Sequence, residues 1–258
     1  MIVAIVQARM GSSRLPGKVL KPVLGKPLLW HLVRRLQHSK LIDKIGIATT
    51  NNKNNEPIIR LAQEMGLALF RGSEEDVLDR FYKAARQFGA SVIVHITSDC
   101  PLVDYEVADR VIGYYLENEG KFDYVSNMHP QTFPDGLDVS VYSFAALEKA
   151  WREATKPFQR EHVTPYIWDQ PEIFRIGNVE NDVDLSGRER WTLDYEEDYE
   201  FIKAIYENLY KEGEVFLMRD ILRFLDAHPE IREINKMHLG KVWYTKHLGE
   251  LKTIGKSG

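Results

Sequence analysis

Short apolar runs alternate with longer amphipathic segments through the first half of the chain. Apolar runs rich in β-branched residues predict strands, and apolar positions spaced three or four residues apart predict helices. The predicted strands are residues 2–6, 44–49, 67–70, 91–96 and 124–126. The predicted helices between them are residues 28–37, 56–65, 74–88 and 105–117. This order predicts an α/β fold, with a mainly parallel sheet and helices on both of its faces.

The pattern becomes less regular after a loop at residues 127–138 that contains proline and glycine. The further strands predicted are 137–142, 174–179 and 190–193, and the further helices are 144–153, 161–168, 197–210 and 218–227. The stretch after Pro229 shows little pattern, and we expect its end to be frayed. Its lysines are Lys236, Lys241, Lys246, Lys252 and Lys256. Without an internal repeat or a clear linker, a single domain is the simpler expectation.

Composition narrows the kind of partner. The 258 residues are 44% hydrophobic and 28% charged, and the net charge of −4 gives no overall positive field for nucleic acid. Cys100 is the single cysteine, which excludes an intramolecular disulfide, and no Cys–His pattern indicates a thiol nucleophile. No apolar run is long enough to span a membrane, and the first residues lack the basic start of a signal peptide. We therefore expect a cytoplasmic protein without membrane or nucleic-acid partners.

One basic loop, QARMGSSRLPGK at residues 7–18, directly follows the first predicted strand. Its cations are Arg9, Arg14 and Lys18, and its glycines are Gly11 and Gly17. Glycines let backbone N–H groups approach phosphate oxygens, Arg donates several hydrogen bonds, and Lys supplies a point charge. Ligands of open α/β sheets bind where the strands end, so the loop predicts a triphosphate or pyrophosphate site. A solvated basic loop is the alternative.

The spacing within this loop excludes the two commonest phosphate-binding motifs. A Walker A loop needs G-x-x-x-x-G-K-[ST], but five residues separate Gly11 from Gly17 here. Val19 also stands where that motif has its metal-binding hydroxyl. The loop does not have the dinucleotide spacing G-x-G-x-x-G either. The usual kinases, GTPases and dehydrogenases are therefore excluded.

Two aspartates stand near the ends of predicted strands. Asp99 follows the strongest predicted strand, where a carboxylate could hold Mg²⁺ against phosphate oxygens; a turn or capping aspartate is the alternative. Asp194 follows a short strand and precedes a helix, and by pattern alone a helix cap is the simpler explanation. We expect Asp104 to cap a helix, and Asp182 and Asp184 to lie in a polar turn rather than on a metal.

Several other polar residues have a structural explanation beside a functional one. Arg160 can pair with a substrate carboxylate or form a surface ion pair, and His162 can donate a hydrogen bond to a ligand or belong to a helix start. Arg71 follows a strand, where its turn can approach a nucleobase, and Ser73 can cap the next helix. We expect His95, inside an apolar run, to be a core histidine with satisfied hydrogen bonds.

Six stretches together resemble one family: QARMGSSRLPGK, FRGSEEDVLDRFY, ITSDCPLVD, DGLDVSVYSF, REHVTPYIW and RWTLDYEEDYEFI. They resemble the CMP-sugar synthetases, which include the cytidylyltransferases for 3-deoxy-manno-octulosonate and the acylneuraminates, and above all the spore coat polysaccharide biosynthesis protein F group. The resemblance runs from residue 1 to about residue 210. It implies a Rossmann-like nucleotidyltransferase fold over residues 1–228, an insert at about 128–170 for dimerisation and the sugar side, and a C-terminal extension at 229–258.

The resemblance also implies an activity. This is the transfer of CMP from CTP to an acidic sugar of the 2-keto-3-deoxy or nonulosonic type, with pyrophosphate release, in surface polysaccharide biosynthesis. Mg²⁺ is the implied cofactor, and a homodimer is the implied assembly.

The site residues follow by matching the motifs position by position. The nucleotide-binding residues are Ala8, Arg9, Gly11, Ser12, Ser13, Arg14, Lys18, Arg71 and Ser98. The catalytic residues are Arg14, Lys18 and Asp99, and the metal ligands are Asp99 and Asp194. The residues on the sugar side are Gly136, Asp138, Arg160 and His162. For Gly136 and Asp138, an ordinary hairpin turn is an equally good explanation.

One segment departs from the family pattern. In WTLDYEED and the residue after it, Tyr195 and Tyr199 stand where the family usually has other residues, so the resemblance does not fix the surroundings of Asp194. We expect the next acidic residues to be a favourable charge set at a helix N-terminus: Glu196, Glu197 and Asp198. Two other classes of protein remain open, a metal-dependent glycosyltransferase that uses a preformed nucleotide sugar and a non-catalytic nucleotide-binding protein.

Overall fold

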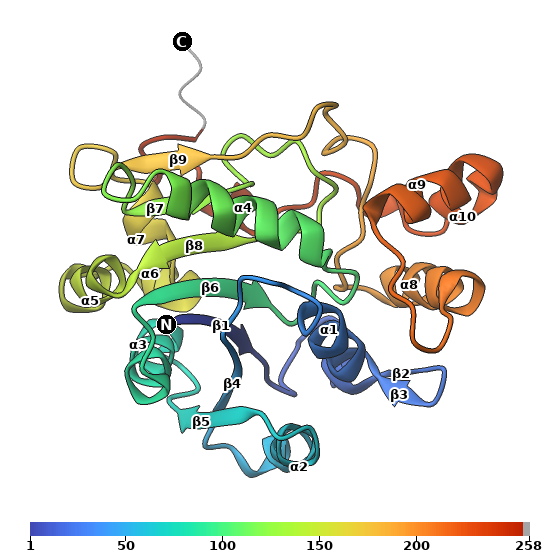
Figure 1. Ribbon diagram of the computed structural model, residues 1–258, viewed down its shortest axis with the longest axis horizontal. Helices are drawn as coiled ribbons and strands as arrows, with labels where there is room; N and C mark the ends of the chain where they lie inside the picture. The colour runs from blue at the N-terminus through green and yellow to red at the C-terminus, as the bar shows by residue number, and fades with distance from the viewer. Residues whose placement is uncertain (255–258) are drawn as a thin grey trace.

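The computed structural model describes residues 1–254, and its centre is a seven-stranded sheet of order β5-β4-β1-β6-β8-β7-β9. The strands are β1 (Ile2–Gln7), β4 (Lys44–Thr50), β5 (Ala68–Gly72), β6 (Val92–Thr97), β7 (Tyr124–Ser126), β8 (Ser140–Ser143) and β9 (Ile176–Asn178). Figure 1 shows them stacked in this order from the bottom of the view to the top. The strand order turns back at β1, which pairs with β4 on one side and β6 on the other, so a ligand crevice is expected at its carboxyl end.

Strand β8 runs antiparallel to both of its neighbours, while the other pairings of this sheet are parallel. Its first residue, Ser140, lies opposite His95 on β6 and Ser126 on β7. Because β8 is antiparallel, its start lies at the same edge as the ends of β6 and β7. The loop before β8, residues 127–139, therefore reaches the edge where the basic loop after β1 also lies.

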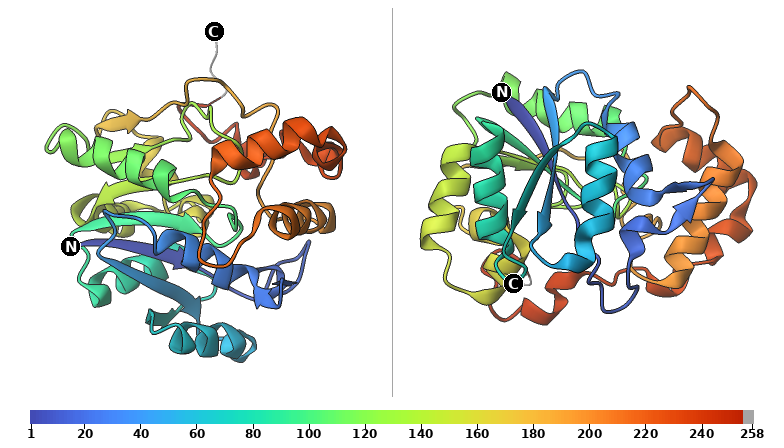
Figure 2. Two further views of the ribbon diagram at one scale, coloured as in Figure 1. Left: turned by 45° about the vertical axis from the view of Figure 1, so that its right-hand side comes forward. Right: turned by 90° about the horizontal axis from the view of Figure 1, so that it is seen from below.

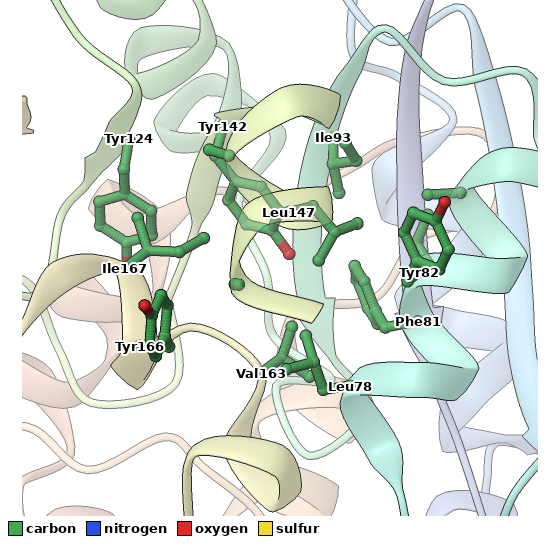
Figure 3. Close-up of a cluster of buried hydrophobic side chains, with 14 of the residues drawn as sticks. Leu78, Phe81, Tyr82, Ile93, Tyr124, Tyr142, Leu147, Val163, Tyr166 and Ile167 are labelled. Atoms are coloured by element: carbon green, nitrogen blue, oxygen red, sulfur yellow. The ribbon is translucent and has the colours of Figure 1, made fainter. Parts of the chain in front are cut away.

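Helices cover both faces of the sheet. One face carries α1 (Leu28–Leu36), α2 (Glu56–Glu64) and α4 (Tyr105–Glu117), and the other carries α3 (Val77–Phe88), α5 (Phe144–Glu153), α6 (Pro157–His162) and α7 (Pro165–Trp168). Both faces need cover because the side chains of β1 point to alternate faces of the sheet. Val3 and Ile5 pack into one core, and Ala4 and Val6 pack into the other. Figure 3 shows part of the first of these cores, where Phe81 of α3 and Leu147 of α5 lie near Ile93 of β6.

A third layer lies beside the sheet (Figure 1) and contains α8 (Glu196–Leu209), α9 (Met218–Ala227) and α10 (Pro229–Glu233). Its core joins Trp191 and Leu193 to Phe201 and Ile205 of α8. The remaining elements are the hairpin β2 (Pro22–Val23) and β3 (Lys26–Pro27), and the 3₁₀ helices Lys18–Leu20, Lys53–Asn55, Lys236–His238 and Trp243–His247. None of the helices found in residues 1–254 is long and apolar enough to cross a membrane.

The α/β class, the mainly parallel sheet and the order of elements in the first half are confirmed. Asp104 caps α4 as predicted, because its Oδ1 accepts hydrogen bonds from Glu106 N at 2.8 Å and Val107 N at 3.4 Å. The capping prediction for Ser73 is wrong in detail. The side chain of Asp76 caps α3 by accepting from Asp79 N, and Ser73 Oγ accepts from Asp76 N one turn earlier.

Three other boundaries differ from the predictions. The predicted helix at 161–168 is two helices, because Val163 between them has a φ of 69°. The stretch 190–193 forms no ladder, and an isolated bridge joins Arg190 to Asp135. The predicted strand 137–142 is displaced and begins at Ser140.

The stretch after Pro229 is folded rather than irregular as far as residue 254. It contains α10 and two 3₁₀ helices, and the Leu251 side chain is 3% exposed. The frayed end and Lys256, named from the sequence, lie outside the described residues.

Candidate active site

A pocket of about 980 Å³ lies at the carboxyl edge of the parallel strands. It is lined by the loops after β1 and β6, by the loop before β8, and by residues 241–247 near the end of the chain. The predicted site residues that line it are Ala8, Arg9, Gly11, Ser12, Ser13, Arg14, Lys18, Ser98, Asp99, Asp138, His162 and Asp194. These predicted residues come from five separate parts of the sequence and meet in one cavity.

The basic loop after β1 is held in a turn by its own backbone. The carbonyl of Met10 accepts the N–H of Gly17 at 3.0 Å, and Gly17 has a φ of 68°, which glycine adopts without strain. The N–H of Met10 donates to Asn55 Oδ1 at 2.8 Å, which fixes the start of the loop. Within residues 1–254, the N–H groups of Gly11 and Ser13 have no acceptor. The loop therefore offers both side-chain cations and free backbone donors to an anion.

Lys18 stands at the centre of the charged groups. Its Nζ lies 2.7 Å from the carbonyl oxygen of Leu193, 2.8 Å from Oδ1 of Asp194 and 3.4 Å from Oδ2 of Asp99. Burial would lower the pKa of Lys18, but the charges of Asp99 and Asp194 outweigh burial and raise the pKa above its usual value. Lys18 is therefore a fixed ammonium ion at neutral pH.

Asp194 lies between two cations. Its Oδ1 accepts from Lys18 and lies 2.7 Å from Nη2 of Arg14. Burial would raise the pKa of Asp194, but Lys18 and Arg14 lower it below its usual value. The carboxylate stays ionised, as an ion-binding role requires.

Asp198 positions Asp194 by accepting a hydrogen bond from its backbone N–H. The Asp198 side chain is fully buried, and its Oδ2 accepts the N–H groups of Asp194 at 2.9 Å and Tyr195 at 3.0 Å. Nε and Nη2 of Arg190 each donate to Asp198 at 3.0 Å. The sequence indicated only a favourable charge near the helix N-terminus. In the structure the Asp198 side chain accepts from the N–H of Tyr195, the N-cap residue of α8, and Arg190 donates to both Asp198 oxygens.

Asp135 and Asp138 add two more carboxyl groups to the pocket. Asp135 accepts from Nη1 of Arg190 at 3.0 Å, but burial and the nearby charge of Asp99 raise its pKa to about 6. Burial, with Asp135 and Asp99 close by, raises the pKa of Asp138 well above its usual value. The sequence predicted Asp138 here and missed Asp135, which precedes Gly136 in the same loop.

Two carboxylates of the pocket could hold a Mg²⁺ ion if phosphate oxygens of a bound ligand completed the site. No three His, Cys, Asp or Glu side chains in the described part of the chain are arranged as a metal site by themselves. Asp99 and Asp194, however, both face one cation, the Lys18 ammonium. Mg²⁺ prefers oxygen ligands and is commonly held by one or two carboxylates together with phosphate oxygens and water. Asp99 and Asp194 beside the basic loop would supply the protein part of such a donor set.

Three predicted site residues do not line the pocket: Arg71, Gly136 and Arg160. Arg71 is exposed on β5. The Arg160 guanidinium makes its hydrogen bonds within the protein. Its Nε donates to Asp76 at 2.8 Å, and its Nη1 donates to the carbonyls of Trp151 and Ala154. Gly136 has a structural role, because a Cβ at this position would lie 2.5 Å from Thr192 N.

The pocket also exposes groups that sequence reasoning missed. Gln7, Arg80 and His95 line it, and each has a buried side-chain atom without a partner within residues 1–254. The prediction of a satisfied His95 is therefore wrong, although burial lowers its pKa to about 4 and keeps it neutral. For Arg80 a signal existed, because it interrupts the apolar face of α3 between Val77 and Phe81.

Two other predictions are confirmed. Cys100 is buried, and burial followed by the charge of Asp99 raises the pKa of its thiol, so it is not an activated nucleophile. Asp184 accepts from Ser186 N at 3.0 Å in a turn, while the Asp182 side chain is 93% exposed.

Comparisons with known proteins agree with this geometry. A family model described as cytidylyltransferase matches residues 3–223. An uncharacterized protein of Methanocaldococcus jannaschii is 42% identical over 91% of this chain and 94% of its own length. The spore coat polysaccharide biosynthesis protein SpsF of Bacillus subtilis is 34% identical over 89% of this chain and 95% of its own. A solved cytidylyltransferase from Leptospira borgpetersenii is 30% identical, has a TM-score of 0.85, and covers 94% of this chain and 98% of its own.

Proposed function

Because this chain belongs to the cytidylyltransferase family, we propose that it transfers CMP from CTP to a hydroxyl group of an acidic sugar and releases pyrophosphate. The observation that carries the proposal is the position of Lys18, whose ammonium lies between Asp99 and Asp194 beside the phosphate-binding loop. This arrangement supplies fixed positive charge and hard oxygen ligands at one point, which phosphoryl-type transfer requires.

The reaction needs no covalent intermediate with the protein. The acceptor hydroxyl oxygen forms a bond to the α-phosphorus, the bond from that phosphorus to the bridging oxygen breaks, and the hydroxyl proton passes to solvent. Arg9 and Arg14 bind the triphosphate and the leaving pyrophosphate, and Lys18 neutralises charge that develops at the reacting phosphate. Asp99 and Asp194 would hold Mg²⁺, which supplies further charge neutralisation at the phosphates when it is bound.

The acceptor class is proposed from the family resemblance and from the pocket together. An acidic sugar of the 2-keto-3-deoxy or nonulosonic type is the expected acceptor. Of the four residues assigned to the sugar by resemblance, Asp138 and His162 line the pocket and carry this part of the proposal. Burial lowers the pKa of His162 to about 4, so its ring is neutral and can both donate and accept hydrogen bonds. The proposal also includes a homodimer, a cytoplasmic location and a place in surface polysaccharide synthesis.

The decisive experiment measures pyrophosphate release. Each nucleoside triphosphate is incubated with Mg²⁺ and with each of a panel of 2-keto-3-deoxy and nonulosonic acids. The proposal predicts release with CTP and at least one acidic sugar, and formation of the matching CMP-sugar. Turnover of a preformed nucleotide sugar, without pyrophosphate release from CTP, would instead identify a glycosyltransferase. Mg²⁺-dependent CTP binding without turnover across the panel would identify a non-catalytic binding protein.

A further inference from the structure

Residues 239–249, which we call the strap, run along the edge of the sheet where the parallel strands end. The right-hand view of Figure 2 shows this red segment passing along the lower side of the molecule, toward α7. Residues 241–247 of the strap line the pocket. Two anchors hold it, one on each side of the pocket.

The first anchor lies at residues 235–238, beside the catalytic carboxylates. Asn235 is buried, and its Nδ2 donates to the carbonyl of Arg190 at 2.9 Å and to Oδ1 of Asp198 at 3.0 Å. The His238 ring stacks on Tyr195 with ring centres 3.9 Å apart. This end of the strap is therefore tied to the residues that position Asp194.

The second anchor lies at residues 250–253, beside α7. Leu251 is buried in the core that α3, α5 and α7 share. The buried carboxylate of Asp169 accepts the N–H groups of Lys252 and Thr253, each at 2.8 Å, and the Thr253 hydroxyl at 2.9 Å. With both ends anchored, the strap has a defined path across the mouth of the pocket.

Between the anchors, the strap places an aromatic side chain on the sugar side of the site. The Trp243 indole stacks on the His162 ring, with centres 3.7 Å apart and planes 23° apart. Trp243 is still 38% exposed, so much of its surface is open to a ligand. Its neighbour Tyr244 lies close enough to Asp135 and Asp138 for their charges to add to burial in raising its pKa.

Lys246 adds a positive charge beside this aromatic surface. Trp243 and Lys246 are three residues apart in the 3₁₀ helix Trp243–His247, and such residues lie on the same side of a 3₁₀ helix. The described residues contain no ion pair of Lys246, whereas Lys241 lies 2.8 Å from Nδ1 of His238. An apolar ring face with a cation next to it suits a sugar ring that carries a carboxylate.

We propose that the strap forms the acceptor half of the active site, with Trp243 packing against the sugar ring and Lys246 binding its carboxylate. This inference rests on the proposed function and names the residues that would select an acidic acceptor. The basic loop after β1, which contains Lys18, then serves the nucleotide. Substitutions in the strap should change acceptor binding and leave CTP binding intact.

The test compares the variants Lys246→Gln and Trp243→Leu with the wild type. Lys211→Gln is the matched control, because Lys211 is exposed, pairs with Glu214 and does not line the pocket. Calorimetry with CTP and Mg²⁺ gives the CTP Kd, and pyrophosphate release gives the KM for 3-deoxy-manno-octulosonate and for N-acetylneuraminate. The carboxamide of each sugar is measured alongside, and thermal melting checks that the variants fold.

Lys246→Gln is expected to raise the KM of the preferred acidic sugar about tenfold or more, the usual worth of a charge-assisted hydrogen bond. It should leave the KM of the carboxamide and the Kd of CTP within about twofold. Trp243→Leu should raise the KM of both forms of the sugar, because it removes packing rather than charge. Equal losses for CTP and the sugar, or an unchanged sugar KM in both variants, would overturn the proposal.

Failure of the proposed function gives a different result. In that case the wild type releases no pyrophosphate with any acidic sugar of the panel. The same two sugars are then titrated into the wild type and Lys246→Gln in the presence of CTP, with tryptophan fluorescence as the signal. Weaker binding to the variant supports the strap as an anion site, and equal binding, or no binding to the wild type, overturns it.

Discussion

Nζ of Lys18 and Oδ1 of Asp194 lie 2.8 Å apart, although 176 positions separate the two residues in the chain. The contact joins the basic loop after β1 to the segment that precedes α8. It also places the ammonium where it reaches Asp99 on the loop after β6. Three loops of the sheet edge thus share one charged centre.

Lys18→Met should lower the rate of pyrophosphate release by about a hundredfold or more, the usual effect of removing a preorganised charge. The reason is that Lys18 is the buried cation nearest both proposed metal ligands. Steady-state kinetics with CTP and an accepted sugar measures the loss. Lys26→Met, on the β2–β3 hairpin outside the pocket, should retain normal activity. A near-normal rate for folded Lys18→Met would remove Lys18 from the mechanism.

Asp194→Asn should raise the Mg²⁺ concentration needed for half-maximal activity, because it removes one of two proposed carboxylate ligands. The variant keeps the shape of the side chain, and its contacts with Arg14 and Lys18 lose only their charge. Mg²⁺ titrations of activity and of CTP binding provide the measurement. Asp182→Asn is the control, since that side chain is 93% exposed. The same Mg²⁺ dependence in both variants would speak against Asp194 as a ligand.

Asp198→Asn should lower the free energy of unfolding by about 3 kcal/mol or more, as expected when one partner of a buried ion pair is removed. Its carboxylate pairs with Arg190 and caps Asp194 and Tyr195, and no solvent reaches it. Urea denaturation measures the change. Asp226→Asn removes a largely exposed carboxylate that also pairs with two arginines, and should cost less than about 1 kcal/mol. Equal costs for the two variants would contradict the role given to Asp198.

The ionisation of Asp135 should affect stability in mildly acidic solution. Its pKa is raised from 3.8 to about 6 in the fold, so the folded state holds a proton that the unfolded state releases. The contribution of Asp135 to the free energy of unfolding is therefore fully present below about pH 4, and it is lost as the pH rises through about 6. The difference in unfolding free energy between the wild type and Asp135→Asn should fall over this range and level off above it. A difference independent of pH, in urea denaturation from about pH 4.5 to about 7.5, would show that the Asp135 pKa is not raised.

Gly136→Ala should be strongly destabilising. Gly136 has a φ of 109°, and a Cβ there would lie 2.5 Å from Thr192 N and 2.6 Å from the carbonyl carbon of Trp191, so backbone must move. We expect a loss above about 2 kcal/mol in denaturant unfolding. Gly187→Ala is the matched control, because an added Cβ there meets nothing within 4 Å. Tolerance of both substitutions would show that the close approach at Gly136 relaxes easily.

Much of the nucleotide side of the site could be predicted from sequence. The rule that ligands bind where parallel strands end was sufficient to place the loop after β1 and Asp99 at one edge of the sheet. Lys18 and Asp194 come together as the family resemblance implied. Local patterns are enough for the basic loop and for Asp99, which follow regular strands. Asp194 needed the family resemblance as well, because its pattern alone indicates a helix cap.

The rest of the pocket depends on contacts that no local pattern contains. Arg160 and Asp76 are 84 positions apart, and their ion pair withdraws Arg160 from the ligand side. The strap was unpredictable for the same reason, since Asn235 bonds to Arg190 and Lys252 bonds to Asp169 at separations of 45 and 83 residues. A lysine-rich segment without clear periodicity is typical of an irregular C-terminal region. The carboxylate that binds its backbone, Asp169, lies far away in the sequence.

The Asp198 carboxylate binds both the backbone at Asp194 and the segment that precedes the strap. One oxygen holds the backbone at Asp194, and the other accepts a hydrogen bond from Asn235 at the base of the strap. A shortened chain ending at residue 228 would leave that buried oxygen without its Asn235 partner and would open the wall of the pocket. We therefore expect that a shortened chain must reach at least to the Asp169 contacts of Thr253 to keep this wall of the pocket, well past the last residue that the family model matches.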